Sequence, residues 1–167
     1  SGMGLMKSAQ LAPEAILLPA NFDAYRHYSR LFKAAVARIA PHIEDRGIDE
    51  IYLDLSDIPE ETEPLARRIK QAVLDATGLR CSIGITPNKL LAKIASDLEK
   101  PDGLTILSEA DIPTRIWPLA ARKVNGIGPK AAARLEKLGI HSIGDLAAAP
   151  PALLVEHFGP TTGRWLN

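Results

Sequence analysis

Apolar side chains recur every three or four residues in three stretches of the chain, which is the spacing of an amphipathic helix. They predict helices over about 21–40, from Pro64 to about 76, and from Thr86-Pro87 to about 98. Shorter apolar runs between these helices predict strands over 42–45, 51–55, 79–85 and 103–107. The resulting order, α-β-β-α-β-α-β, favours an α/β (α+β) fold of the ferredoxin-like kind, with helices covering an open sheet.

The pattern changes after Pro113. Residues 119–166 contain short Ala-rich helical segments that glycines and prolines interrupt. We place a boundary within 108–118, which gives a first domain of residues 1–112 and a small all-helical second domain of residues 113–167.

Composition narrows the class of protein. The chain has 167 residues, 46% hydrophobic and 24% charged, which argues against intrinsic disorder. Twenty Lys and Arg residues balance 20 Asp and Glu residues, so affinity for a polyanion must come from a local cluster. The single cysteine, Cys81, favours a reducing compartment, and no apolar run reaches the roughly 18 residues of a membrane span. We predict a cytoplasmic protein without a membrane partner.

Asp49 and Glu50 are adjacent acids at the predicted turn between the first two strands. Neighbouring side chains of a regular strand point to opposite faces, but a tight turn removes that restriction. Carboxylate oxygens suit Mg²⁺, and two such ions can stabilise the attacking and leaving oxygens of phosphoryl transfer. Asp54 lies roughly 13 Å further along the strand, so it is better suited to a structural role. A solvated acidic turn is the alternative interpretation.

Lysines share one face of the third predicted helix, with Lys89, Lys93 and Lys100 on the side opposite the apolar positions. A solvated helix face explains this arrangement. The stripe gains significance only if it faces the same cleft as the acidic pair, because cations there would offset the charge of a triphosphate.

Gly126-Ile127-Gly128-Pro129-Lys130 is the most specific motif in the chain. Two glycines permit a tight connection between helices, and proline suits the first position of the second helix. Free amides at a helix start bind phosphate, so the segment predicts a helix-hairpin-helix that grips a DNA backbone. Its neighbourhood is basic, with Arg122, Lys123, Lys130, Arg134 and Lys137. A helical corner without a ligand is the alternative.

Taken together, residues 48–54, 82–103 and 126–128 resemble, in this order, Y-family DNA polymerases of the bacterial polymerase IV type. The resemblance implies a partial palm with the end of the fingers connection over 1–112, and a helix-hairpin-helix thumb, incomplete at its C-terminus, over 113–167. By position, Asp49 and Glu50 match catalytic carboxylates that bind two Mg²⁺ ions. Lys100 matches a lysine that reaches the incoming triphosphate.

The same resemblance assigns Gly126, Ile127, Gly128 and Lys130 to the contact with primer-template DNA. The implied reaction is attack of a primer 3′-hydroxyl on the α-phosphate of a deoxynucleoside triphosphate, past damaged template bases. Gly47 stands where the family usually has serine, and Asn125 where it often has proline.

The chain also departs from the family in what it lacks. The palm's first strand, with its further metal-binding aspartate, is absent, as are most of the fingers and the C-terminal region that usually carries a sliding-clamp tail. The resemblance therefore implies an inactive fragment of a lesion-bypass polymerase.

Two other functions stay open. One is a non-catalytic DNA-binding or scaffold protein derived from the Y-family, although the retained Asp49–Glu50 pair favours catalysis in the parent. The other is a helix-hairpin-helix module attached to an unrelated α/β domain.

Overall fold

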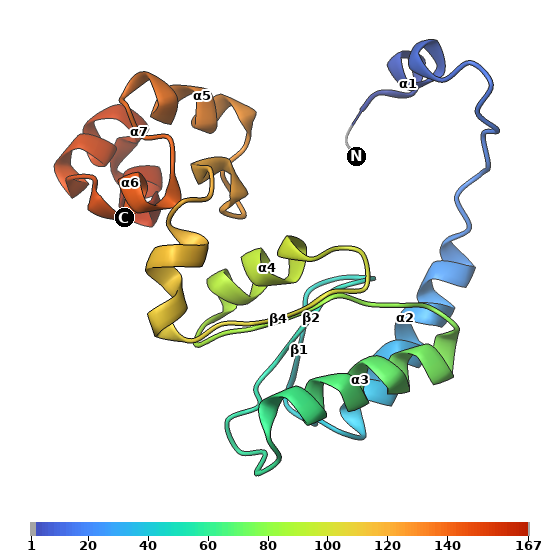
Figure 1. The fold of residues 1–167 in the computed structure, drawn as a ribbon. Helices are drawn as coiled ribbons and strands as arrows, with labels where there is room; N and C mark the ends of the chain where they lie inside the picture. Colours follow the sequence, from blue (N-terminus) through green and yellow to red (C-terminus); the bar gives the residue numbers. More distant parts are fainter. Residues whose placement is uncertain (1–2, 167) are drawn as a thin grey trace.

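The computed structural model describes residues 3–166, and its first part is built from alternating helices and strands (Figure 1). Residues 1, 2 and 167, which begin and end the two predicted domains, lie outside the described residues. The elements follow the predicted order: α2 (Phe22–Ala37), β1 (Ile43–Asp45), β2 (Ile51–Leu53), α3 (Thr62–Thr77), β3 (Ile83–Ile85), α4 (Lys89–Leu98) and β4 (Leu104–Ile106). The predicted α/β class is confirmed.

The strands form two separate pairs. β1 and β2 are antiparallel, with Ile43 opposite Leu53, whereas β3 and β4 are parallel, with Ile83 opposite Leu104. The single open sheet that the sequence predicted is not formed by the described residues. Each strand contributes only three residues, and the two pairs are joined by side chains that pack on a common apolar cluster.

Polar side chains and glycine set the helix ends. The Asn21 side chain accepts a hydrogen bond from the Ala24 amide at 3.0 Å and caps α2. α3 ends at Gly78 in the left-handed conformation, as the sequence predicted. The predicted cap of α4 at Thr86 was wrong, because the Asn88 side chain accepts from the Leu91 amide and starts the helix at Lys89.

Two apolar clusters hold the chain together. The first joins α2 and α3 to both strands of the β1–β2 hairpin and to Ile83 of β3. The second begins on α4 with Leu91 and Ile94, passes through Leu107 and continues into the C-terminal helices. α4 therefore belongs to the core of the helical part, although the predicted boundary at 112/113 separates them in sequence.

The C-terminal part is helical. It contains the short turns η1 (Glu109–Asp111), η2 (Ile112–Ile116) and η3 (Ala121–Lys123), and the helices α5 (Pro129–Lys137), α6 (Ile143–Ala148) and α7 (Pro151–Leu166). Gly159 has φ +81° and interrupts α7. In Figure 1 these helices gather at one end of the molecule, beyond α4.

An additional helix, α1 (Leu5–Leu11), was not predicted. None of its residues is buried, and Figure 1 shows it away from the other elements, at the end of an extended segment. None of the helices described over residues 3–166 is both long and apolar enough to cross a membrane.

Candidate functional site

The acidic turn connects β1 to β2. The Arg46 amide donates to the Glu50 carbonyl at 3.1 Å and closes the turn that carries Asp49 and Glu50. Both are exposed. Asp54 has the structural role that the sequence suggested: its carboxylate accepts from the Ser56 amide at 3.0 Å, and hydrogen bonding to Ser56 lowers its pKa.

Two lysines of α4 contact acidic residues of the β1–β2 hairpin. The Lys93 ammonium donates to Glu50 Oε1, and the Lys89 ammonium donates to Glu44 on β1. Lys93 is largely covered, with 22% of its side chain exposed. Partial burial alone lowers its pKa, but the hydrogen bond and the charge of Glu50 outweigh burial and raise the pKa of Lys93 overall. The lysine stripe thus meets the acidic pair at Lys93.

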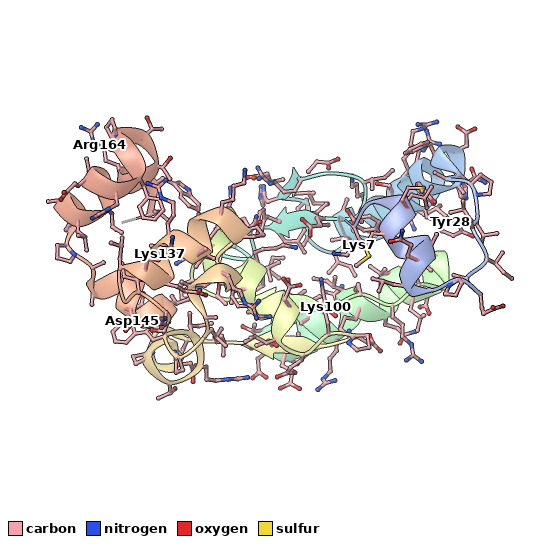
Figure 2. The ribbon with its side chains drawn as sticks, turned by 90° about the horizontal axis from the view of Figure 1, so that it is seen from above. Lys7, Tyr28, Lys100, Lys137, Asp145 and Arg164 are labelled. Atoms are coloured by element: carbon pink, nitrogen blue, oxygen red, sulfur yellow. The ribbon has the colours of Figure 1, made fainter. Side chains whose placement is uncertain are left out.

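Lys100 has different contacts. Its ammonium pairs with Asp97 at 2.6 Å on the same turn, and no described contact joins it to Asp49 or Glu50. Figure 2 shows Lys100 on the α/β part and Lys137 on the helical part.

The loop that follows Lys100 is anchored from α3 by Lys70. This ammonium donates to Asp102 Oδ1 at 2.6 Å, to the Asp102 carbonyl at 2.9 Å and to the Cys81 carbonyl. Only 17% of the Lys70 side chain is exposed. The hydrogen bond from Lys70 is the main reason that the pKa of Asp102 is lowered.

The donor set of the acidic turn fits a hard divalent cation. Two exposed, adjacent carboxylates offer oxygen ligands of the kind that Mg²⁺ takes, together with substrate phosphates and water. Within residues 3–166 no group of three or more His, Cys, Asp or Glu side chains is arranged to hold a metal. Asp49 and Glu50 could therefore supply part of a coordination shell, and the remaining ligands would have to come from elsewhere.

The glycine hairpin joins η3 to α5. Gly126 has φ +102°, and a Cβ at this position would lie 2.7 Å from the Trp165 ring of α7. Gly128 is the N-cap of α5 and Pro129 its first residue, as predicted. Gly126, Gly128 and Lys130 are exposed, whereas the Ile127 side chain is buried in the core, so that only its backbone can face a ligand.

The cations around the hairpin differ in their contacts. Arg134 turns toward α7, where it donates to the His157 carbonyl and lies 4.7 Å from the centre of the Phe158 ring. The other four, all exposed, form no ion pair with any residue in the described range: Arg122, Lys123, Lys130 and Lys137.

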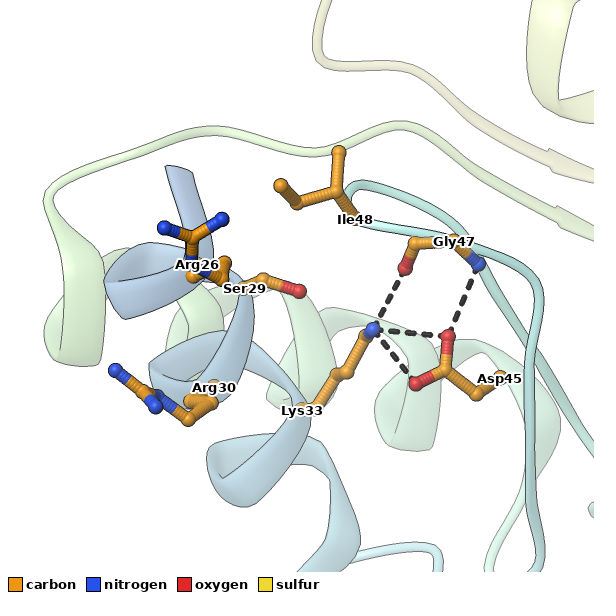
Figure 3. A pocket seen from close by; sticks show the side chains of 7 residues that line it. All are labelled: Arg26, Ser29, Arg30, Lys33, Asp45, Gly47 and Ile48. Atoms are coloured by element: carbon orange, nitrogen blue, oxygen red, sulfur yellow. Dashed lines mark hydrogen bonds and ion pairs between the residues drawn. The ribbon is translucent and has the colours of Figure 1, made fainter. Parts of the chain in front are cut away.

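Sequence reasoning missed three contributors to these sites. Lys33 on α2 contacts Asp45 and Gly47 beside the acidic turn (Figure 3), Lys70 anchors the loop after Lys100, and Trp165 covers Gly126. Each contact joins residues far apart in sequence, so the only local signal was a basic or aromatic residue at an amphipathic position.

Comparison with protein-family models matches both parts of the chain. A model of the impB/mucB/samB family matches residues 1–97, and a model of the IMS family HHH motif matches residues 109–140. Among curated proteins, the chain is 39% identical over 170 residues to DNA polymerase IV of Moorella thermoacetica and 42% identical over 167 residues to DNA polymerase IV 1 of Bacillus subtilis. These alignments cover 100% and 99% of this chain, but only 42% and 40% of the two relatives.

Solved structures with the same arrangement are also polymerases. The chain matches DinB from Sulfolobus solfataricus with a TM-score of 0.89 and 32% identity, over 99% of this chain and 50% of that one. An insertion ternary complex of Dbh DNA polymerase matches with a TM-score of 0.87 and 32% identity, over 99% of this chain and 49% of that one. The chain therefore spans less than half of these two curated relatives and about half of these two solved structures.

Proposed function

We propose that this chain, which belongs to the impB/mucB/samB family, is the palm and thumb part of a DNA polymerase that copies templates past damaged bases. Its resemblance to Y-family polymerases of the polymerase IV type, first seen in the sequence, is confirmed by relatives and solved structures. The observation that carries the proposal is the Asp49–Glu50 pair, exposed on a closed turn with Lys93 against Glu50.

Asp49 and Glu50 would help to hold two magnesium ions, and such ions would supply charge stabilisation at the reacting phosphate. The Glu50 carboxylate already accepts a hydrogen bond from the Lys93 ammonium. When a cation binds, it must either displace this ammonium or share the carboxylate with it. Lys93 then remains beside the site as a positive charge, directed at the region where triphosphate oxygens would lie.

Lys100 would bind the triphosphate. Its pair with Asp97 is exposed on both sides, and exposed pairs contribute little, so release of the ammonium costs about 0–1 kcal/mol. Lys70 anchors the loop after Lys100 through its hydrogen bonds to Asp102.

The glycine hairpin would hold the DNA backbone. The start of α5 has no side-chain cap at Gly128, and unpaired cations surround it; both features suit phosphate oxygens and carry no base information. Deoxynucleoside triphosphates and primer-template DNA are the proposed substrates. A sliding-clamp partner and a cytoplasmic location remain predictions.

Primer extension tests the proposal. We expect no extension by residues 1–167 alone, and extension by a chimera in which this chain replaces the matching segment of the Moorella thermoacetica relative. Asp49→Ala or Glu50→Ala in the chimera should abolish extension, whereas Asp57→Asn, an exposed acid after β2, should not change it. A chimera that binds primer-template without extending it, or that keeps full activity in both alanine variants, would refute the proposal.

A non-catalytic scaffold from the same family is the second candidate. The unpaired cations around the hairpin serve DNA binding equally well in such a protein. A chimera without substitutions that binds DNA but does not extend the primer would favour the scaffold. The third possibility from the sequence, a hairpin module on an unrelated α/β domain, is contradicted because both parts match one family.

A further inference from the structure

One lysine of α2 is turned toward the acidic turn. The Lys33 ammonium donates to both carboxylate oxygens of Asp45, at 2.9 and 2.8 Å, and to the Gly47 carbonyl at 2.6 Å (Figure 3). Asp45 Oδ1 also accepts from the Gly47 amide at 2.9 Å. These four hydrogen bonds form a closed group, which we call the Lys33 clamp. Its last residue, Gly47, lies two residues before Asp49 in the chain.

The clamp joins the turn to α2, as the pair of Lys93 and Glu50 joins it to α4. Gly47 has φ +144°, which favours glycine, and nothing lies within 4 Å of the position its Cβ would occupy. Ile48 is exposed. Because apolar packing does not fix this side of the turn, its position depends on polar contacts from α2.

Lys33 differs from the other cations of α2. Arg26 pairs with Asp23 of its own helix, and the Arg30 side chain forms no ion pair or hydrogen bond within the described residues. All three line an open hollow of about 300 Å³ between α2 and the turn, but only Lys33 crosses it. Its side chain is 21% exposed, so the ammonium is held by the protein more than by water.

We propose that Lys33 is a positioning residue: its ammonium ties the acidic turn to α2 and so sets where Asp49 and Glu50 stand for the reaction. The inference rests on the proposed function. The Glu50 side is already held by Lys93 of α4, so the turn is fixed between two helices, one at each end. Asp45 serves as the intermediate group, and the Lys33 ammonium and the Gly47 amide both lower the pKa of its carboxyl.

The first test needs no activity. Amide hydrogen exchange of the isolated chain should speed up by about tenfold at residues 47–50 in Lys33→Met, which corresponds to the loss of one charged hydrogen bond. Lys33→Arg should keep exchange near that of the unmodified chain, and Asp45→Asn should behave like Lys33→Met. Arg30→Met removes a cation of the same helix outside the clamp and should change nothing. Unchanged exchange in Lys33→Met would overturn the clamp.

The second test measures the reaction in the chimera. Lys33→Met should lower kcat by about tenfold with little change in the KM for the nucleotide, because alignment of the acids is lost while substrate contacts remain. Lys33→Arg should restore kcat. An undiminished kcat in Lys33→Met, or an equal loss in Arg30→Met, would overturn the positioning role. Full activity in Asp49→Ala would instead remove the proposed function, and the exchange result would still stand.

Discussion

The acidic turn and the glycine hairpin differ in how their charges are satisfied. In the turn, Glu50 is paired with Lys93, and the neighbouring Asp45 is paired with Lys33. Around the hairpin, four exposed cations have no acidic partner in the described part of the chain. Residues 119–167 contain six Lys and Arg against three Asp and Glu, whereas residues 1–118 contain 14 against 17.

This difference suggests two ways of preparing a site for charged ligands. A partnered carboxylate stands in a defined place, and a cation that binds there must compete with the lysine. A cation without an acidic partner has no such competitor when it binds a phosphate, which suits a backbone of repeated phosphates. In the proposed function, catalysis would require carboxylates in fixed positions, whereas contact with the backbone of a duplex would require only positive charge.

The largest effect should come from the shape of the hairpin. Gly126→Ala adds a Cβ 2.7 Å from Trp165 at φ +102°, so we expect a loss of about 2–4 kcal/mol in the free energy of unfolding. Gly139→Ala is the control, because Gly139 has φ +76° with nothing near its Cβ, and should cost about 1 kcal/mol. Equal losses in urea unfolding would show that the Trp165 contact does not matter.

DNA binding should depend strongly on salt. If about three phosphates are neutralised, affinity for a short duplex falls roughly 40-fold between 50 and 200 mM salt. Replacing Lys123 and Lys130 by Met should leave a fall of only about 3- to 4-fold, whereas Arg67→Met, on α3, should not change the slope. Fluorescence anisotropy measures the affinity at each salt concentration. If the double variant shows the same dependence on salt as the unmodified chain, the DNA contact lies elsewhere.

The competition at Glu50 is open to a direct test. Lys93→Met removes the ammonium from the carboxylate, so Mn²⁺ affinity of the chain should rise by about 3- to 10-fold. Lys89→Met removes a lysine that pairs with Glu44 instead and should have no such effect. Mn²⁺ titration followed by electron paramagnetic resonance distinguishes the two variants, and weaker binding in Lys93→Met would contradict competition between Lys93 and the cation for Glu50.

The smallest effect concerns the loop after Lys100. Because Lys70 lowers the pKa of Asp102, this contact stabilises the fold above the ordinary carboxyl pKa of about 3.9 and is lost as the pH falls through the lowered value. Lys70→Met should raise the titration midpoint of Asp102 toward the ordinary value, and Arg67→Met should not. Carbon-detected NMR titration measures both, and an unmoved midpoint would separate Asp102 from Lys70.

Local signals in the sequence predicted most elements of the fold. Helical periodicity placed α2 and α3, and Gly78 marked the end of α3, because each depends on residues close together in the chain. The same approach failed where alternatives compete locally, as at Thr86 and Asn88, which both suit a helix cap.

Sheet pairing was harder to predict because it depends on contacts between distant strands. Four short strands were foreseen, but their division into two pairs follows from packing that periodicity does not report. For the site, the acidic pair and the hairpin were visible as local motifs. The roles of Lys33 and Lys70 could not be predicted, since a lysine on a helix is usually solvated. Only the folded structure shows which lysines contact a loop.

Paramagnetic broadening by Mn²⁺ tests for a metal site at the acidic turn, because it reports where a divalent cation binds on the chain itself. At substoichiometric Mn²⁺, we predict that amide signals of residues 47–52 and of Lys93 broaden first, and that Asp49→Ala removes the effect. Broadening that begins at other acids, such as Asp102 or Glu136, or that persists unchanged in Asp49→Ala, would contradict a metal site at the acidic turn.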